Sequence, residues 1–223
     1  MKRLNIDYSL YLVTDRKLAR GRTTLEVVQA AVRGGVTCVQ LREKSCSTRE
    51  FIEEARAIKG FLSASAIPLI INDRVDVALG IQADGVHLGQ TDMPLSMARS
   101  IVGSGMLIGI SAESLQDAVE AEKMGADYLG VSPIYDTPTK TDTAPSLGLE
   151  GLHRIRSAVK LPLVGIGGLN LTNAGEVVAN GADGVAVVSA IVSAENCETA
   201  ARRLRDLIDR AKAEPQGDVS EFI

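Results

Sequence analysis

The chain has 223 residues, of which 45% are hydrophobic and 23% charged, and its formal net charge is −4 at pH 7. This length suits one large α/β domain, and the slight excess of acidic side chains argues against nucleic acid as a main partner. The N-terminus lacks the apolar stretch of a signal peptide, and no apolar run approaches the ~18 residues of a membrane span. We therefore expect a cytoplasmic protein with no membrane partner.

Eight short apolar runs alternate along the chain with segments that have the apolar spacing of amphipathic helices. The expected strands cover residues 9–15, 38–43, 68–73, 85–89, 107–111, 128–133, 163–168 and 184–189. The expected helices cover residues 24–35, 48–62, 74–82, 95–102, 115–125, 149–159, 172–181 and 197–213. The periodicity is lost at the C-terminus, so we place the folded domain at residues 1–212 and expect a flexible tail at 213–223.

An internal repeat supports this series of strand–helix units. The segments "GGVTCVQL", "QADGVHLG", "GADYLGVS" and "GADGVAVV" each end a helix and begin an apolar strand. Strands that are rich in Val, Ile and Leu along their whole length indicate a parallel sheet buried on both faces. The sequence therefore predicts an α/β protein with a single (β/α)8 TIM barrel. The alternative, a doubly wound open sheet, lacks a GxGxxG turn after its first strand.

In such a barrel the active site lies where the carboxyl ends of the strands meet the loops that follow. The segment "QLREK" ends one expected strand, and the period of two of a strand points Gln40, Arg42 and Lys44 in one direction. An amide, a guanidinium and an ammonium group would thus converge at the mouth of the barrel. Ser111 ends a later strand at the same mouth.

Two loop carboxylates, Asp73 and Asp92, follow neighbouring strands beside these cations. Mg²⁺ is commonly held by one or two carboxylates together with phosphate oxygens and water. The ordinary alternative for either aspartate is a turn or a helix cap. Asn72 precedes Asp73, and two cationic side chains lie at the end of the adjacent strand. We therefore expect Mg²⁺ and an anion at this side of the mouth, in addition to the phosphate site described next.

The segments "GIGG" and "VVSAI" follow the last two expected strands. Barrels often bind phosphate at this place through backbone amides. Gly168 and the hydroxyl of Ser189 are therefore candidates for a phosphate site. The alternative is that Gly165, Gly167 and Gly168 only make a tight turn.

The histidines and cysteines give no sign of a hydrolase or of an all-protein metal site. His87 lies in an apolar strand, where a packed, hydrogen-bonded core histidine is favoured over a base, and His153 lies on a helix and is expected to be solvated. The chain has no Ser-His-Asp order and no HExxH. Cys38, Cys46 and Cys197 lack metal or disulfide spacing, so structural or spectator roles are favoured.

The loop at residues 134–148 contains the stretch "DTPTKTDT", which has no apolar residue. The loop is longer than most βα loops and lies at the mouth of the barrel, so a lid is favoured over a slack linker. Lys140 and the hydroxyls of Thr137 and Thr139 suit phosphate groups. Pro138 restricts the freedom of the loop.

As a set, "QLREK", "IINDR", "GVHLGQTD", "VSPIYDTPTK" and "VGIGG" resemble the motifs of the thiamine phosphate synthase family, and the resemblance extends from "LYLVTDR" to "VVSAI". It implies a (β/α)8 barrel that joins 4-amino-2-methyl-5-hydroxymethylpyrimidine diphosphate to 4-methyl-5-(2-phosphoethyl)thiazole and releases diphosphate, with Mg²⁺ as cofactor. The partners would then be small-molecule substrates. The sequence leaves a homo-oligomer open.

The resemblance also implies a role for each matching residue. The magnesium ligands would be Asp73 and Asp92. The catalytic residues would be Arg42, Lys44, Ser111 and Lys140. The residues implied in substrate binding are Gln40, Leu41, Arg42, Glu43, Lys44, Asn72, Ser111, Thr137, Pro138, Thr139, Lys140, Gly168, Val188 and Ser189.

Two positions depart from the pattern of this family. Ser132 stands where a glycine is common, and Glu113 stands where many relatives have a histidine. A related barrel, the thiazole tautomerase, is thought to use a histidine near that place as its acid/base, so Glu113 weakens the tautomerase alternative. A non-catalytic protein that binds thiazole phosphate is the other alternative, and it should lack part of the cation and carboxylate set that this chain has.

Overall fold

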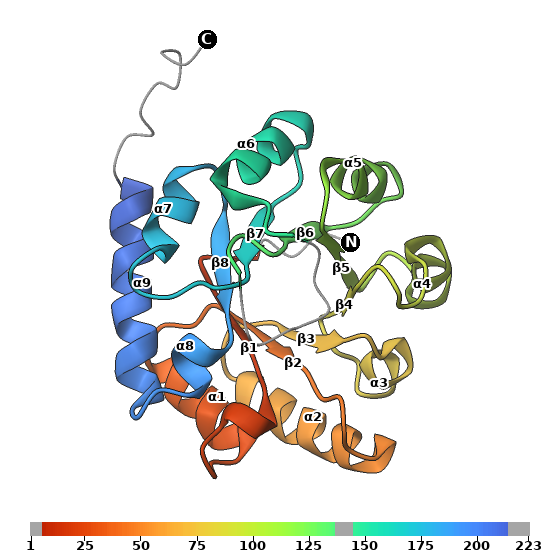
Figure 1. Ribbon diagram of the computed structural model, residues 1–223. Coiled ribbons are helices and arrows are strands. Elements are labelled where there is room, and N and C mark those ends of the chain that lie inside the picture. Colours follow the sequence, from red (N-terminus) through yellow and green to blue (C-terminus); the bar gives the residue numbers. More distant parts are fainter. Residues whose placement is uncertain (1–5, 137–144, 214–223) are drawn as a thin grey trace.

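The computed structural model describes residues 6–136 and 145–213, and it shows a closed barrel of parallel strands surrounded by helices (Figure 1). The strands are β1 (Leu10–Val13), β2 (Cys38–Leu41), β3 (Leu69–Asn72), β4 (Gly85–Leu88), β5 (Leu107–Ala112), β6 (Tyr128–Val131), β7 (Leu163–Ile166) and β8 (Gly184–Val187). Each strand pairs with the next in the chain, and β1 pairs with β8 to close the barrel. The predicted (β/α)8 barrel is confirmed, and the open-sheet alternative is excluded.

Most helices begin and end close to the predicted positions. They are α1 (Thr24–Arg33), α2 (Thr48–Leu62), α3 (Val75–Gly80), α4 (Leu95–Val102), α5 (Leu115–Lys123), α6 (Gly148–Ala158), α7 (Ala174–Ala179) and α9 (Cys197–Ala213). The last helix thus includes the first residue of the predicted tail, and residues 214–223 lie outside the described part of the chain. No helix in the described part combines the length and the apolar character needed to cross a membrane.

Two short helices, η1 (Arg16–Leu18) and α8 (Ser189–Val192), were not predicted. Each follows a strand whose predicted C-terminal end is too long, because the chain leaves the sheet and turns at once. The Asp15 side chain accepts hydrogen bonds from the amides of Lys17 and Leu18 and so caps η1. An aspartate at this place therefore starts a turn and does not extend the strand.

Capping boxes fix the starts of the first two long helices. The Thr23 hydroxyl accepts from the Glu26 amide, and the Glu26 carboxylate accepts from the Thr23 amide, at the start of α1. Ser47 and Glu50 repeat the arrangement at the start of α2. Both boxes close the loop that leaves the mouth of the barrel, so the preceding strand ends are held in place.

Side chains alternate along each strand between the inside of the barrel and the surrounding helices. The larger core lies between strands and helices, and α9 packs along α1 and α7 to cover one side (Figure 1). A second, smaller cluster fills the inside of the barrel; its buried members are Tyr8, Tyr11, Val13, Cys38, Ile70, Leu107, Tyr128, Val164 and Ala186. The cysteines are unpaired thiols, and two of them are buried, which agrees with structural roles.

Gly109 on β5 makes room for the largest side chain inside the barrel. A Cβ atom at this position would lie 2.1 Å from Cζ of Tyr128 and 2.5 Å from its hydroxyl oxygen. The Tyr128 ring cannot move far, because it is fully buried and packs against the tilted ring of Tyr8 with the centroids 4.8 Å apart. The tyrosine on β6 therefore depends on the glycine on β5.

Replacing Gly109 with alanine is expected to lower the free energy of unfolding by about 1–3 kcal/mol, the usual cost of overpacking a core. Urea denaturation measures this change. Gly60→Ala on α2 is the control, because a Cβ there meets nothing within 4 Å, and alanine in a helix should be stabilising by about 0.5–1 kcal/mol. Equal stability of Gly109→Ala and the unchanged protein would show that Tyr128 is not held as described.

Candidate active site

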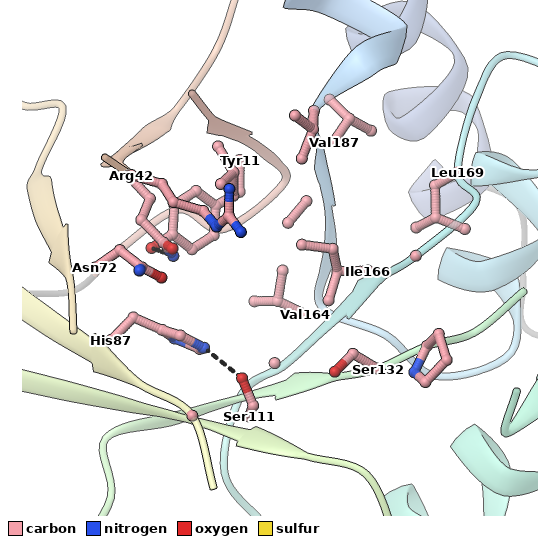
Figure 2. Close-up of a pocket in the computed structure, with 18 of the residues that line it drawn as sticks. Tyr11, Arg42, Asn72, His87, Ser111, Ser132, Val164, Ile166, Leu169 and Val187 are labelled. Carbon is pink, nitrogen blue, oxygen red and sulfur yellow. Dashed lines mark hydrogen bonds between the residues drawn. The ribbon is translucent and has the colours of Figure 1, made fainter. Parts of the chain in front are cut away.

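A cavity of about 630 Å³ opens at the carboxyl ends of the strands. Every strand contributes to its lining, and the side chains of Arg42 and Asn72 face those of Ile166 and Leu169 across it (Figure 2). This is the end of the barrel at which the sequence predicts the active site. The predicted residues Gln40, Lys44, Asp73, Asp92, Ser111, Gly168, Val188 and Ser189 also line it.

Arg42 follows the end of β2 and is held at the cavity by contacts to the end of β1. Its backbone amide donates to the Thr14 hydroxyl (3.0 Å), and its Nη1 donates to Oδ2 of Asp15 (3.4 Å). The guanidinium side chain is 25% exposed, so it is partly shielded from water yet reachable by a ligand. Such a group can bind phosphate through two parallel N–H bonds.

Two of the residues implied in substrate binding do not have their side chains in the cavity. Leu41 is fully buried in the outer core. The side chain of Glu43 is 3% exposed and pairs with Arg16 (Oε1 to Nε, 3.4 Å). Burial raises the pKa of Glu43, and the nearby Glu54 adds to this rise. The alternation that turns Gln40, Arg42 and Lys44 inward also turns these two side chains outward. This part of the motif therefore stabilises the strand from outside the barrel.

Asp73 and Asp92 come together at the ends of β3 and β4. Asp73 adopts a left-handed backbone with φ of +62°, a conformation that non-glycine residues adopt rarely and that clusters at functional sites. Asp92 accepts from the Gly89 amide (2.8 Å). Burial raises the pKa of Asp92, and its hydrogen bond with Asp73 raises it further. Lys44 forms an ion pair with Asp73. Two carboxyl groups thus share one corner of the cavity.

This corner could hold a divalent cation. Beside it, the amide nitrogen of Asn72 is buried and has no hydrogen-bond partner, so it can donate to an oxygen of a bound anion. Within residues 6–136 and 145–213 no group of three or more His, Cys, Asp or Glu side chains is arranged around one point. The donor set is therefore a carboxylate pair, of the kind that carries Mg²⁺ together with phosphate oxygens.

The opposite wall is made by the turns after β7 and β8. Gly167 and Gly168 have φ of +103° and +67°, and a Cβ at Gly168 would lie 2.8 Å from the backbone oxygen of Asp136. The Asn173 side chain donates to the Gly168 carbonyl (3.0 Å) and fixes the turn. The backbone therefore requires glycine at these two positions, which agrees with the part of the tight-turn alternative that assigns the glycines to a turn. Gly167 and Gly168 still line the cavity, as does Ser189 at the start of α8.

Several lining residues were missed by the sequence interpretation. Tyr11, Tyr128 and Asn170 line the cavity, and Gln90 does so while its amide donates to the carbonyl of Ser111 (2.5 Å). The inward alternation of β1 and β6 could have found the tyrosines. Asn170 lies in a turn, where the sequence carries no comparable signal.

His87 is buried and hydrogen-bonded, as predicted. Its Nδ1 lies 3.0 Å from the Tyr128 hydroxyl and its Nε2 lies 3.0 Å from Oγ of Ser111, the contact drawn in Figure 2. It also lines the cavity, which the prediction of a core histidine did not include. His153 is exposed on α6, as expected. Of the departures from the family pattern, Glu113 and Ser132 both line the cavity.

The remaining predicted site residues are Thr137, Pro138, Thr139 and Lys140. They lie outside the described residues, and so does most of the predicted lid. Their roles stay predictions. The described flanks of the loop, Asp136 and Pro133, reach the cavity, so the loop starts at its rim.

Residues 10–191 match the family model described as thiamine monophosphate synthase. The chain belongs to the thiamine monophosphate synthase family. It is 53% identical over 207 residues to the thiamine-phosphate synthase of Syntrophomonas wolfei, which covers 93% of this chain and 99% of the relative. It is 56% identical over 200 residues to the thiamine-phosphate synthase of Albidiferax ferrireducens, covering 90% and 91% of the two chains. The resemblance predicted from the motifs is confirmed.

Solved structures agree with this placement. The thiamine phosphate pyrophosphorylase from Pyrococcus furiosus superposes with a TM-score of 0.86 at 41% identity, over 92% of this chain and 97% of that one. A 3-hexulose-6-phosphate synthase superposes with a TM-score of 0.67 at 16% identity, over 89% and 99% of the two chains. At that identity the second similarity concerns the fold alone.

Proposed function

We propose that the chain joins 4-amino-2-methyl-5-hydroxymethylpyrimidine diphosphate to 4-methyl-5-(2-phosphoethyl)thiazole, giving thiamine phosphate and diphosphate. The observation that supports the proposal is one cavity with two walls whose groups are suited to bind anions. Arg42, Lys44 and the pair Asp73–Asp92 form one wall, and the glycine turn with Ser189 forms the other. Two phosphate-bearing substrates can therefore lie in the same cavity with their reactive atoms between the walls.

The diphosphate belongs on the cationic wall. Arg42 and Lys44 supply positive charge, and Asn72 supplies a buried amide donor without a partner. Asp73 and Asp92 would hold Mg²⁺, which when bound offsets the negative charge of the diphosphate. As the C–O bond to the pyrimidine methylene breaks, charge grows on the leaving oxygens. Fixed donors aimed at that charge stabilise the transition state more than the ground state.

The thiazole phosphate belongs on the glycine wall. Gly168 and Ser189 anchor the phosphate, which places the thiazole nitrogen close to the methylene carbon that loses diphosphate. The nitrogen attacks this carbon with its own lone pair and has no proton to release. The reaction therefore needs no general base, and it is compatible with an inward-facing histidine whose two nitrogens are both engaged.

The test is an assay of purified protein with both substrates and Mg²⁺, in which diphosphate and thiamine phosphate are measured together. We expect diphosphate and thiamine phosphate in equal amounts. When the thiazole phosphate is left out, we expect no thiamine phosphate and no diphosphate formed together with it. Thiazole isomerisation without diphosphate release would instead favour the tautomerase alternative. Tight binding of thiazole phosphate without turnover would favour the non-catalytic alternative.

Replacing Ser189 with alanine is expected to raise KM for the thiazole phosphate about 10-fold, because a hydrogen bond to a charged group is lost. KM for the pyrimidine diphosphate should change little, since its diphosphate binds the opposite wall. Ser157→Ala on the exposed face of α6 is the control. Equal increases in both KM values would contradict the division of the cavity into two walls.

A further inference from the structure

A continuous chain of hydrogen bonds crosses the inside of the barrel among residues that line the cavity. Nε2 of Gln40 donates to the Tyr11 hydroxyl (3.0 Å), which lies 2.9 Å from the Tyr128 hydroxyl. The Tyr128 hydroxyl lies 3.0 Å from Nδ1 of His87, and Nε2 of His87 lies 3.0 Å from Oγ of Ser111. The chain thus links two residues predicted to bind substrate, Gln40 on β2 and Ser111 on β5, through three side chains that the proposed chemistry does not use.

The barrel is shaped to let these side chains meet. Gly109 leaves the space that the Tyr128 ring occupies, as described above, and a Cβ at Gly130 would lie 3.0 Å from Cε1 of His87. Both glycines are on strands that face the cavity, where a side chain would displace a member of the chain. Tyr11 and Tyr128 are almost completely buried and His87 is 8% exposed, so water competes little for these bonds.

The donors along the chain can be assigned from one end. Burial raises the pKa of Tyr11 and of Tyr128 well above the ordinary value, so each hydroxyl keeps its single proton. The Tyr11 hydroxyl accepts from the Gln40 amide and donates to Tyr128. Tyr128 then donates to Nδ1 of His87. A neutral imidazole that accepts at Nδ1 carries its proton on Nε2 and donates there.

The Cys38 thiol also competes for the Tyr11 proton. It lies within hydrogen-bonding reach of the Tyr11 hydroxyl. A thiol is a weak acceptor compared with a hydroxyl oxygen. The Tyr128 oxygen therefore receives the proton, and the direction of the chain is kept.

We propose that His87 is a positioning residue, held as the Nε2–H tautomer by Tyr11 and Tyr128 so that it donates to Ser111 and leaves the Ser111 hydroxyl proton for the substrate. Ser111 then presents a donor to the cavity and Gln40 presents its carbonyl oxygen as an acceptor. If the chain ran the other way, Ser111 would donate to His87 and both presented groups would be reversed. The identity of the substrate atom that accepts from Ser111, on the pyrimidine diphosphate, rests on the proposed function; the tautomer does not.

The tautomer can be measured on the ligand-free protein by ¹⁵N NMR of the imidazole nitrogens at pH 8, above the ordinary histidine pKa of about 6.5. The chain has only one other histidine, the exposed His153, and His153→Gln assigns the spectrum. We expect Nδ1 of His87 in the unprotonated range and Nε2 in the protonated range. Tyr128→Phe should give a mixture of tautomers. The Nδ1–H tautomer in the unchanged protein, or an unchanged tautomer in Tyr128→Phe, would overturn the proposal.

A double-mutant cycle tests whether the chain acts on the substrate. We compare the fold loss in kcat/KM that Ser111→Ala causes in two backgrounds. This loss should be at least about threefold smaller in Tyr128→Phe than in the unchanged protein, because without Tyr128 the Ser111 hydroxyl is no longer fixed as a donor to the substrate. His87→Gln, which keeps an N–H near Ser111, should retain more activity than His87→Leu. Additive effects, or equal losses in the two His87 variants, would overturn the positioning role. The NMR result does not require turnover, so failure of the proposed function and failure of this inference are distinguishable.

Discussion

Replacing Asp92 with asparagine is expected to lower kcat/KM by about 10²-fold or more, the largest effect that we predict for a single side chain. Removing one charge-stabilising group from an active site commonly costs this much. Asparagine keeps the size of the side chain and can still accept from the Gly89 amide. It removes one of two carboxyl groups that lie within hydrogen-bonding reach of each other. The fold should persist, because the substitution changes a side chain at the cavity, which we propose holds Mg²⁺, and does not change a core contact.

Thermal unfolding with and without Mg²⁺ and diphosphate separates a loss of ligand binding from a loss of fold stability. The unchanged protein should be stabilised by the ligands together, since they bind only the folded state. Asp92→Asn should unfold at a similar temperature without ligand and gain little from adding them. Asp76→Asn, at an exposed carboxylate that pairs with Arg74 on the outside of the barrel, is the control. Full ligand-dependent stabilisation and full turnover in Asp92→Asn would remove Asp92 from the site.

Arg42→Ala is expected to have the second largest effect, a loss of about 10²-fold in kcat/KM. Its guanidinium is held at the cavity by Asp15 and is only 25% exposed, so its charge is weakly screened by water. The charge that grows on the departing diphosphate should need this group more in the transition state than in the ground state. Most of the loss should therefore appear in kcat.

The measurement is steady-state kinetics with each substrate varied in turn, together with inhibition by the product diphosphate. Diphosphate should inhibit Arg42→Ala more weakly, while KM for thiazole phosphate stays nearly unchanged. Arg49→Ala on the exposed side of α2 controls for the loss of one positive charge. A larger change in KM for the thiazole phosphate than in inhibition by diphosphate would contradict the assignment of Arg42 to the wall that binds the diphosphate.

The barrel could be predicted because its signal repeats along the whole chain. Most strand residues are apolar on both sides, since one side faces the helices and the other the inside of the barrel, and each long helix has one apolar side. Strand ends were less predictable. The residues after Val13 and after Val187 continue the apolar or extended pattern, yet η1 and α8 begin almost at once because local caps and turns compete with the sheet.

The polar members of the site could also be predicted from strand ends, since the closed barrel brings Arg42, Asp73 and Asp92 to one cavity. The motif also includes Leu41 and Glu43, whose side chains face away from the cavity, so the substrate-binding roles that the resemblance implies for them stay predictions. His87 shows the opposite limit. Its burial was predicted, but its partners Tyr128 and Ser111 lie on strands that only the closed barrel brings within reach.

A crystal structure with Mg²⁺, thiamine phosphate and diphosphate bound together tests the central claim most directly, namely that one cavity holds two anions on opposite walls. We expect the diphosphate against Arg42 and Lys44 with the metal on Asp73 and Asp92. We expect the phosphate of thiamine phosphate at Gly168 and Ser189. Both anions on the same wall, or thiamine phosphate in the reverse orientation, would contradict the account.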